Sequence, residues 1–202
     1  MSLIAVIDYG MGNLKSVAKA LQKVGGKVIV THDSKTIQQA DKIVLPGVGA
    51  YPQCMSNLKA HGLVDVVKEE IAKGKWFLGI CLGFQLLFEE SEEFGPSTGF
   101  GILKGKVKRF PQSPLKIPHM GWNGLALRHR SPLFEGIPHK SSFYFVHSYY
   151  VVPKENEIIS GETFYGIPFC SSIQKKNILA CQFHPEKSQS LGLKVLENFV
   201  HL

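Results

Sequence analysis

Gly79-Ile80-Cys81-Leu82-Gly83 lies between an apolar run at residues 76–78 and a helix-like run at residues 84–88. A strand that turns sharply into a helix needs small residues on both sides of the turn, because a side chain at 79 or 83 would collide with the strained backbone at its tip. A thiol at the start of a helix is also favoured as thiolate by unpaired amides and the helix dipole. The stretch predicts a nucleophile elbow carrying Cys81; the alternative is a buried turn without a catalytic role.

A candidate base follows a β-like run near the other end of the sequence. His184 and Glu186 come directly after residues 178–182. Sites in open α/β sheets lie at the carboxyl ends of strands, so we expect Cys81 and His184 to share one edge. An imidazole can take the thiol proton and deliver it to a leaving amine, and a carboxylate can orient that imidazole. In an extended segment His184 and Glu186 point to the same side, with Pro185 restricting the backbone between them. A core histidine is the alternative for His184.

These motifs resemble the class I (triad-type) glutamine amidotransferase family, which implies a Cys81–His184–Glu186 triad that hydrolyses the side-chain amide of glutamine to ammonia. Further stretches narrow the resemblance to the glutaminase subunits of imidazole glycerol phosphate synthases, of histidine biosynthesis: Pro46–Gly49, His119–Asn123, Tyr144–Tyr149 and Phe183–Gln189. Together with the elbow, the motifs run through nearly the whole chain. Their combination is more specific than any one of them.

Composition is consistent with one domain spanning residues 1–202. The chain is 44% hydrophobic and 19% charged, which is ordinary for a soluble globular protein. No apolar run approaches membrane-spanning length and no signal peptide is recognisable, so we expect a cytoplasmic protein that does not engage membranes. The four cysteines are scattered without a C-x-x-C pair, which argues against disulfides and a zinc site. We expect no metal and no cofactor, and packing roles for Cys54, Cys170 and Cys181.

The net charge of +7 does not predict nucleic-acid binding. Phosphate-binding proteins cluster their basic residues, and here the densest stretch is Lys104 to Arg109, where Lys104, Lys106 and Lys108 alternate. Alternation of this kind is typical of a solvated strand face. An acidic protein partner is the second interpretation, and nucleic acid comes well behind it.

The pattern along the chain predicts an α/β fold with an open, mostly parallel, doubly wound sheet. Apolar strands alternate with amphipathic helices up to the elbow; the expected strands are 3–8, 28–31 and 42–45, and the expected helices carry Leu14 to Val24 and Leu63 to Ile71. From Phe100 to Gln182 the segments become β-rich, which predicts an insertion with antiparallel parts. A C-terminal helix with Leu191, Val195, Leu196 and Phe199 completes the fold.

The loop Gly10-Met11-Gly12-Asn13-Leu14-Lys15 superficially matches a dinucleotide-binding turn. Lys15 replaces the third glycine of that motif, and no acidic residue closes a suitable second strand, because Asp33 lies in a turn. We therefore interpret the loop as a tight strand-to-helix turn with Asn13 capping the helix. The family resemblance places it beside a partner subunit.

Attack on an amide builds negative charge on oxygen, so the site needs an oxyanion hole. The Leu82 N–H, directly after the nucleophile, is one expected donor. The second is expected from Val48 or Gly49, because the flanking glycines let the peptide rotate; a plain turn is the alternative. In the family, rotation of this loop accompanies activation by the partner.

The resemblance also implies which residues hold glutamine and which contact a partner. Glutamine contacts fall on Gly47, Gln85, Ser148 and Tyr149, where Ser148 stands in place of an expected threonine. The implied partner is a (β/α)₈-barrel cyclase subunit, which would bind the phosphorylated nucleotide, and the implied interface comprises Asn13, Met120, Trp122, Tyr144 and Lys187.

Two alternatives stay open at this stage. A paralogous amidotransferase could use the same chemistry to supply ammonia to sugar biosynthesis. A cysteine peptidase or a catalytically silent module could use the same scaffold, although residues 119–123 and 187–189 argue against a peptidase and the intact triad argues against silence.

Overall fold

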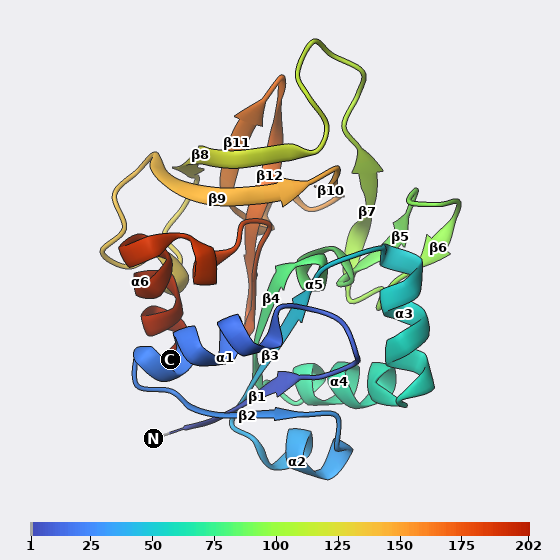
Figure 1. Ribbon diagram of the computed structural model, residues 1–202, viewed down its shortest axis with the longest axis vertical. Helices are drawn as coiled ribbons and strands as arrows, with labels where there is room; N and C mark the ends of the chain where they lie inside the picture. Colours follow the sequence, from blue (N-terminus) through green and yellow to red (C-terminus); the bar gives the residue numbers. More distant parts are fainter. Residues whose placement is uncertain (1) are drawn as a thin grey trace.

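A row of parallel strands forms the centre of the structure, a computed structural model that describes residues 2–202 (Figure 1). Most of these strands are buried along nearly their whole length, which explains their continuous apolar runs. In spatial order they are β2 (Lys27–Thr31), β1 (Leu3–Ile7), β3 (Lys42–Gly47), β4 (Trp76–Cys81) and β13 (Ile178–Cys181).

Helices cover both faces of this sheet, which confirms the doubly wound prediction. One face carries α1 (Leu14–Lys23) and α6 (Gln189–Val200), whose Leu21 and Val195 share one apolar core. The other carries α2 (Ser34–Gln39), α3 (Tyr51–Ala60) and α4 (Leu63–Ala72), whose side chains fill a second core. Asn13 stands at the N-cap of α1 but makes no side-chain capping hydrogen bond, so the predicted cap is wrong.

The β-rich insertion extends the sheet with antiparallel strands, as predicted. The edge beyond β13 continues through β12, β10 and β7, while β8 pairs with β9 to form a ribbon. Figure 1 shows this ribbon lying across the end of the parallel strands. The bounds are β7 (Leu103–Arg109), β8 (His119–Leu127), β9 (Ser141–His147), β10 (Tyr149–Pro153), β11 (Ile159–Tyr165) and β12 (Ile167–Lys175), with 3₁₀ turns η1 (Pro132–Phe134) and η2 (Asn156–Ile158).

The helix expected at residues 84–88 is wrong in extent. Helix α5 spans Leu82–Gln85, and Phe88 already belongs to β5 (Phe88–Ser91), which pairs with β7 and with β6 (Ser97–Thr98). The helix ends early because Phe88 pairs with Leu103 in the sheet. A one-turn helix has a small dipole, so the predicted dipole contribution to the Cys81 thiolate loses most of its weight.

Burial agrees with the packing roles expected for three of the cysteines and with the solvated strand face expected at residues 104–109. All four cysteines are buried and free, including Cys54, Cys170 and Cys181 in the apolar cores. The lysines of β7 alternate with buried residues, as a solvated strand face requires. Within residues 2–202, no helix is long and apolar enough to cross a membrane.

Candidate active site

Cys81 stands at a strained turn between β4 and α5. Its φ of 54° and ψ of −107° are rare for a residue with a side chain. The neighbouring glycines allow this turn: a Cβ at Gly83 would lie 1.9 Å from the Leu45 carbonyl oxygen, and one at Gly79 would lie 2.7 Å from the Gly83 carbonyl oxygen. The predicted elbow therefore exists, although Gly83 is required by close contact with β3 and not by the backbone of Cys81 itself.

His184 follows β13, which runs parallel to β4 with Cys181 opposite Ile80. The carboxyl ends of the two strands therefore meet, and His184 and Cys81 line the same pocket, as expected. The backbone of His184 is anchored to β9, because its N–H donates to the Tyr144 carbonyl at 2.9 Å. Ser188 Oγ adds a hydrogen bond to the His184 carbonyl at 2.7 Å and accepts one from the Tyr144 N–H.

The His184 imidazole contacts the Glu186 carboxylate, with Nδ1 2.9 Å from Oε1. Both side chains are almost fully buried. The segment between them was expected to be extended, and this expectation is wrong: Pro185–Lys187 form a 3₁₀ turn, η3. The turn still brings both groups together because Pro185 suits the first position of a helical turn.

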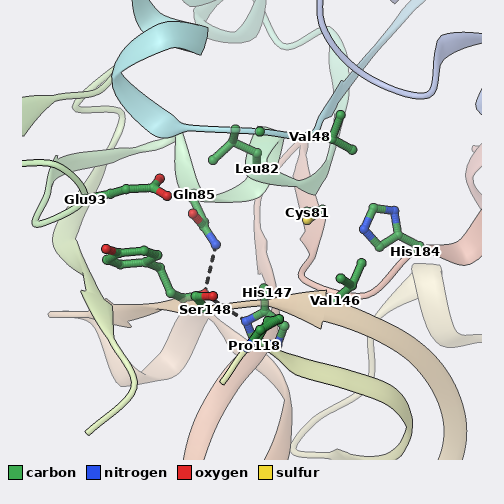
Figure 2. A pocket seen from close by; sticks show the side chains of 12 residues that line it. Val48, Cys81, Leu82, Gln85, Glu93, Pro118, Val146, His147, Ser148 and His184 are labelled. Carbon is green, nitrogen blue, oxygen red and sulfur yellow. Dashed lines mark hydrogen bonds between the residues drawn. The ribbon is translucent and has the colours of Figure 1, made fainter. Parts of the chain in front are cut away.

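The charge state of His184 is set by its neighbours. Burial lowers the pKa of the imidazole, but the adjacent Cys81 and Glu186 outweigh burial and raise the pKa to about 10. Nε2 of His184 has no hydrogen-bond partner among residues 2–202. Figure 2 shows the His184 ring and the Cys81 sulfur facing each other. The ring can therefore carry a proton at neutral pH and present it toward the pocket.

The pocket around Cys81 has a volume of about 270 Å³, small for an organic-ligand site and suited to a molecule of amino-acid size (Figure 2). Strand-end loops, the elbow and the junction between β9 and β10 supply its walls. The lining residues are Val48, Gly49, Cys81, Leu82, Gln85, Glu93, Pro118, Val146, His147, Ser148, Tyr149 and His184.

Most of the site residues expected from the sequence thus meet in one pocket. Gly47 and Glu186 do not line this pocket: both line a small crevice behind it, together with Asn13. A Cβ on Gly47 would lie 2.8 Å from the Cβ of Leu82, so this glycine is needed for close packing. Its expected contact with glutamine stays a prediction.

The loop at residues 46–49 is held from beneath by buried side chains. The Tyr9 hydroxyl donates to the Pro46 carbonyl at 2.9 Å, and the Cys54 sulfur lies 3.7 Å from the Val48 carbonyl oxygen. The Val48 carbonyl is therefore directed at α3. Because a trans peptide places its N–H opposite its carbonyl, the Gly49 N–H is directed away from α3.

Three polar residues at the site were missed by the sequence reasoning. Glu93 lines the pocket, accepts a hydrogen bond from the Tyr51 N–H at 2.8 Å, and has its pKa raised by burial. His147 adjoins Ser148 in the pocket wall. Gln182 is fully buried with Nε2 3.6 Å from the Cys81 sulfur. No local pattern in the sequence marks Gln182, because its partner Cys81 lies 101 positions away in the chain.

The residues expected at a partner interface gather in part on the outer face of the ribbon. Met120 and Trp122 are 62% and 49% exposed, unusual for such large apolar side chains. Trp122 pairs in register with Tyr144, and the Lys187 ammonium lies 5.8 Å from the centre of the Tyr144 ring. Asn13 lies apart from this group, at the start of α1.

Comparison with known proteins adds family information to this geometry. Residues 5–202 match the family model described as glutamine amidotransferase class-I. Three relatives carry the name imidazole glycerol phosphate synthase subunit HisH. The protein from Aquifex aeolicus is 54% identical, and the match covers 96% of this chain and 94% of the relative. The protein from Moorella thermoacetica is 52% identical, with 100% of this chain and 96% of the relative covered. The protein from Syntrophotalea carbinolica is 50% identical, with 98% of each chain covered.

Solved structures share the fold at low sequence identity. The structure of PurLQS from Thermotoga maritima matches with a TM-score of 0.75 and 16% identity, covering 100% of this chain and 99% of its own. The glutaminase domain of CTPS from Trypanosoma brucei matches with a TM-score of 0.71 and 16% identity, covering 100% of this chain and 92% of its own. At this level of identity, these similarities support the α/β fold and carry no information about function.

Proposed function

The chain belongs to the class I glutamine amidotransferases and, within them, to the HisH subunits of imidazole glycerol phosphate synthase, and on that premise we propose that it releases ammonia from glutamine for a cyclase partner. One observation carries the chemistry. A strained cysteine faces an imidazole that is raised in basicity and paired with a buried carboxylate. This arrangement provides a nucleophile and a proton carrier in one small pocket, with an orienting group directly behind the proton carrier.

In the first half of the proposed reaction, the Cys81 thiolate attacks the side-chain carbonyl carbon of glutamine. The carbonyl electron pair moves onto oxygen and returns as the carbon–nitrogen bond breaks. The His184 imidazolium gives its Nε2 proton to the departing nitrogen, so ammonia leaves and a γ-glutamyl thioester remains on Cys81. Glu186 holds Nδ1 at 2.9 Å and keeps Nε2 aimed at the pocket without moving a proton.

In the second half, water attacks the thioester. Neutral His184 takes one water proton, the carbon–sulfur bond breaks, and the Cys81 thiolate and the imidazolium are restored. The new γ-carboxyl group keeps the other water proton and releases it to solvent as glutamate leaves. Both tetrahedral intermediates carry an oxyanion. We assign its donors to the Leu82 N–H, beside the nucleophile, and to an N–H of Val48 or Gly49 across the pocket.

Recognition of an amino acid requires partners for its charged ends. Ser148 and Tyr149 line the pocket, and so does Gln85. The Glu93 carboxylate points into the same space (Figure 2), and it suits the α-ammonium group of glutamine. A glutamine residue within a peptide has an amide in place of the free α-ammonium group. The proposed site therefore favours free glutamine.

A partner is expected because ammonia released into water would be protonated and lost. The relatives are named as subunits of a synthase, which supports a multi-subunit enzyme of histidine biosynthesis. We assign the partner as a (β/α)₈-barrel cyclase in the cytoplasm. We assign its contact surface to Met120, Trp122, Tyr144 and Lys187, with Asn13 at the start of α1 as a separate contact. Aromatic, methionine and charged anchors of this kind are typical of interface centres.

The proposed function is tested by reconstitution with that cyclase. We expect glutamate release from glutamine to be slow in the isolated chain and to rise on addition of the cyclase and its nucleotide ligand. Imidazole glycerol phosphate should form with glutamine as nitrogen source. If the complex formed but used only ammonium salts, the glutaminase assignment would be wrong. If glutamine were hydrolysed but no cyclase product formed, the pathway assignment would be wrong.

A further inference from the structure

Gln182 is a buried amide that reaches the reacting sulfur. It follows β13, and it is fully buried. Its Nε2 lies 3.6 Å from Cys81 Sγ, within the range of an N–H to sulfur hydrogen bond. An amide N–H close to a buried thiolate offers a hydrogen bond that solvent cannot provide there. The proposed triad chemistry assigns no step to this residue.

The orientation of the Gln182 amide is determined by Gln85. Gln85 Nε2 donates to Gln182 Oε1 at 2.9 Å, which turns the nitrogen of Gln182 toward Cys81. The same Gln85 nitrogen donates to the Tyr149 carbonyl at 3.0 Å. A backbone carbonyl can only accept, so Gln85 must present its nitrogen, and Gln182 must then present its oxygen to Gln85. Both amide orientations follow from the network.

The network continues into the ribbon with a fixed direction of donation. The Tyr149 carbonyl also accepts from His147 Nδ1 at 2.8 Å, so neutral His147 must accept at Nε2 from His119 Nδ1, 2.9 Å away. His119 Nε2 in turn accepts from Asn123 Nδ2 at 3.1 Å. Burial lowers the pKa of His119 to about 4 and of His147 to about 3, which keeps both rings neutral.

We propose that Gln182 is a further catalytic residue, whose side-chain N–H binds the Cys81 sulfur and stabilises its thiolate, and that Gln85 and His147 are positioning residues that hold this amide in place. The proposal rests on the proposed function in taking Cys81 as the nucleophile. It also gives Gln85 a role besides contact with glutamine, because both its N–H groups are already bound inside the protein.

The test compares wild type with Gln182→Met, which keeps the size of the side chain and removes the N–H. The rate of Cys81 alkylation by iodoacetamide is followed against pH by peptide mass spectrometry, without glutamine or partner. We expect the pH of half-maximal rate to move up by about 1 unit, because each unit corresponds to about tenfold in the stability of the charged form. In the cyclase complex, kcat should fall about tenfold or more while KM changes less than about threefold.

Companion variants separate this role from a structural one. Gln182→Glu keeps the bond from Gln85 but places an acceptor against the sulfur, so its alkylation profile should shift at least as far upward. Gln85→Met should shift the profile in the same direction, and the double variant Gln85→Met/Gln182→Met should be no worse than Gln182→Met alone. Gln174→Met, outside the pocket, is the matched control and should leave the profile unchanged.

Unchanged alkylation profiles in folded Gln182→Met and Gln182→Glu proteins would overturn the proposal. A loss of folding in one variant leaves the other and Gln85→Met to decide, with circular dichroism as the check. Failure of the proposed function would look different: wild-type complex would release no ammonia from glutamine, while the alkylation shift would still report on Gln182.

Discussion

His184 Nδ1 lies 2.9 Å from Glu186 Oε1, and the pair is buried beside the Cys81 sulfur. The folded-state pKa of about 10 exceeds the ordinary value of 6.5, so the folded protein binds this proton more tightly than the unfolded chain. The resulting stabilisation is fully present below pH 6.5 and is lost as pH rises toward 10.

Replacing Glu186 should show how much this carboxylate raises the pKa of His184. In Glu186→Gln the His184 pKa, measured by NMR of labelled histidine, should fall by more than about 1 unit, because the buried carboxylate no longer stabilises the charged ring. Glutamine turnover should fall, and it should fall further in His184→Ala, which removes the proton carrier itself. An unchanged His184 pKa in Glu186→Gln would contradict the orienting role.

His147 should make the protein sensitive to acid. Its folded-state pKa is lowered to about 3 by burial, so below pH 6.5 the unfolded state binds the extra proton and the folded state loses stability. The groups facing its ring are His119 on β8 and His184, with the Tyr149 carbonyl as hydrogen-bond partner.

The titration of His147 should lower the free energy of unfolding at pH 5 by about 2 kcal/mol, because pH 5 lies about 1.5 units below the pKa of histidine in the unfolded chain. Urea unfolding of wild type and His147→Asn at pH 7.5 and pH 5 measures the difference. The variant should lose about 2 kcal/mol less than wild type between the two pH values. Equal losses would show that His147 titrates normally.

Trp122 should be a major contributor to partner affinity. It is 49% exposed, packs edge-on against Tyr144 and lies on the ribbon face. Trp122→Ala should weaken cyclase binding by about 30-fold, as expected for an aromatic residue at an interface centre. Phe94→Ala is the control, because Phe94 is 82% exposed but lies in the turn between β5 and β6. Calorimetric titration giving equal affinities for both variants would exclude the ribbon as the interface.

Val48 should control stimulation by the partner. Val48→Pro removes its N–H, so activation by the cyclase should largely vanish while Cys81 alkylation and partner binding persist. A competent fraction below ~1% in the isolated chain would allow on the order of 100-fold stimulation in wild type. Val48→Ala, which keeps the N–H, should retain it. Full stimulation of Val48→Pro in a glutamate-release assay would place the second oxyanion donor elsewhere.

The elbow and the alternation of buried strands with helices could be predicted from the sequence because they depend on local patterns. Glycines at 79 and 83 and apolar runs determine where a strand can turn and which segments are buried. The short length of α5 could not be predicted, since it depends on pairing of Phe88 with Leu103 across the fold. The short helix α2 and the weakly amphipathic α3 likewise carried too little periodicity to be recognised.

The missed site residues share a physical cause. Gln182 contacts Cys81 across 101 positions in the chain, and Glu93 enters the pocket through its bond to the Tyr51 backbone. Such contacts are set by tertiary packing and leave no local pattern. His184 and Glu186 were found because two positions of separation suffice for contact, although the turn between them is 3₁₀ and not extended.

The central claim is that Cys81 is the nucleophile that attacks glutamine and takes no part in the cyclase reaction. The most direct measurement is product formation by the cyclase complex carrying Cys81→Ala, with either glutamine or an ammonium salt as nitrogen source. We expect synthesis from glutamine to be abolished and synthesis from the ammonium salt to match wild type, because the cyclase chemistry does not need the thiol. Retained synthesis from glutamine, with glutamate released in step, would contradict the assignment of Cys81 and the mechanism built on it.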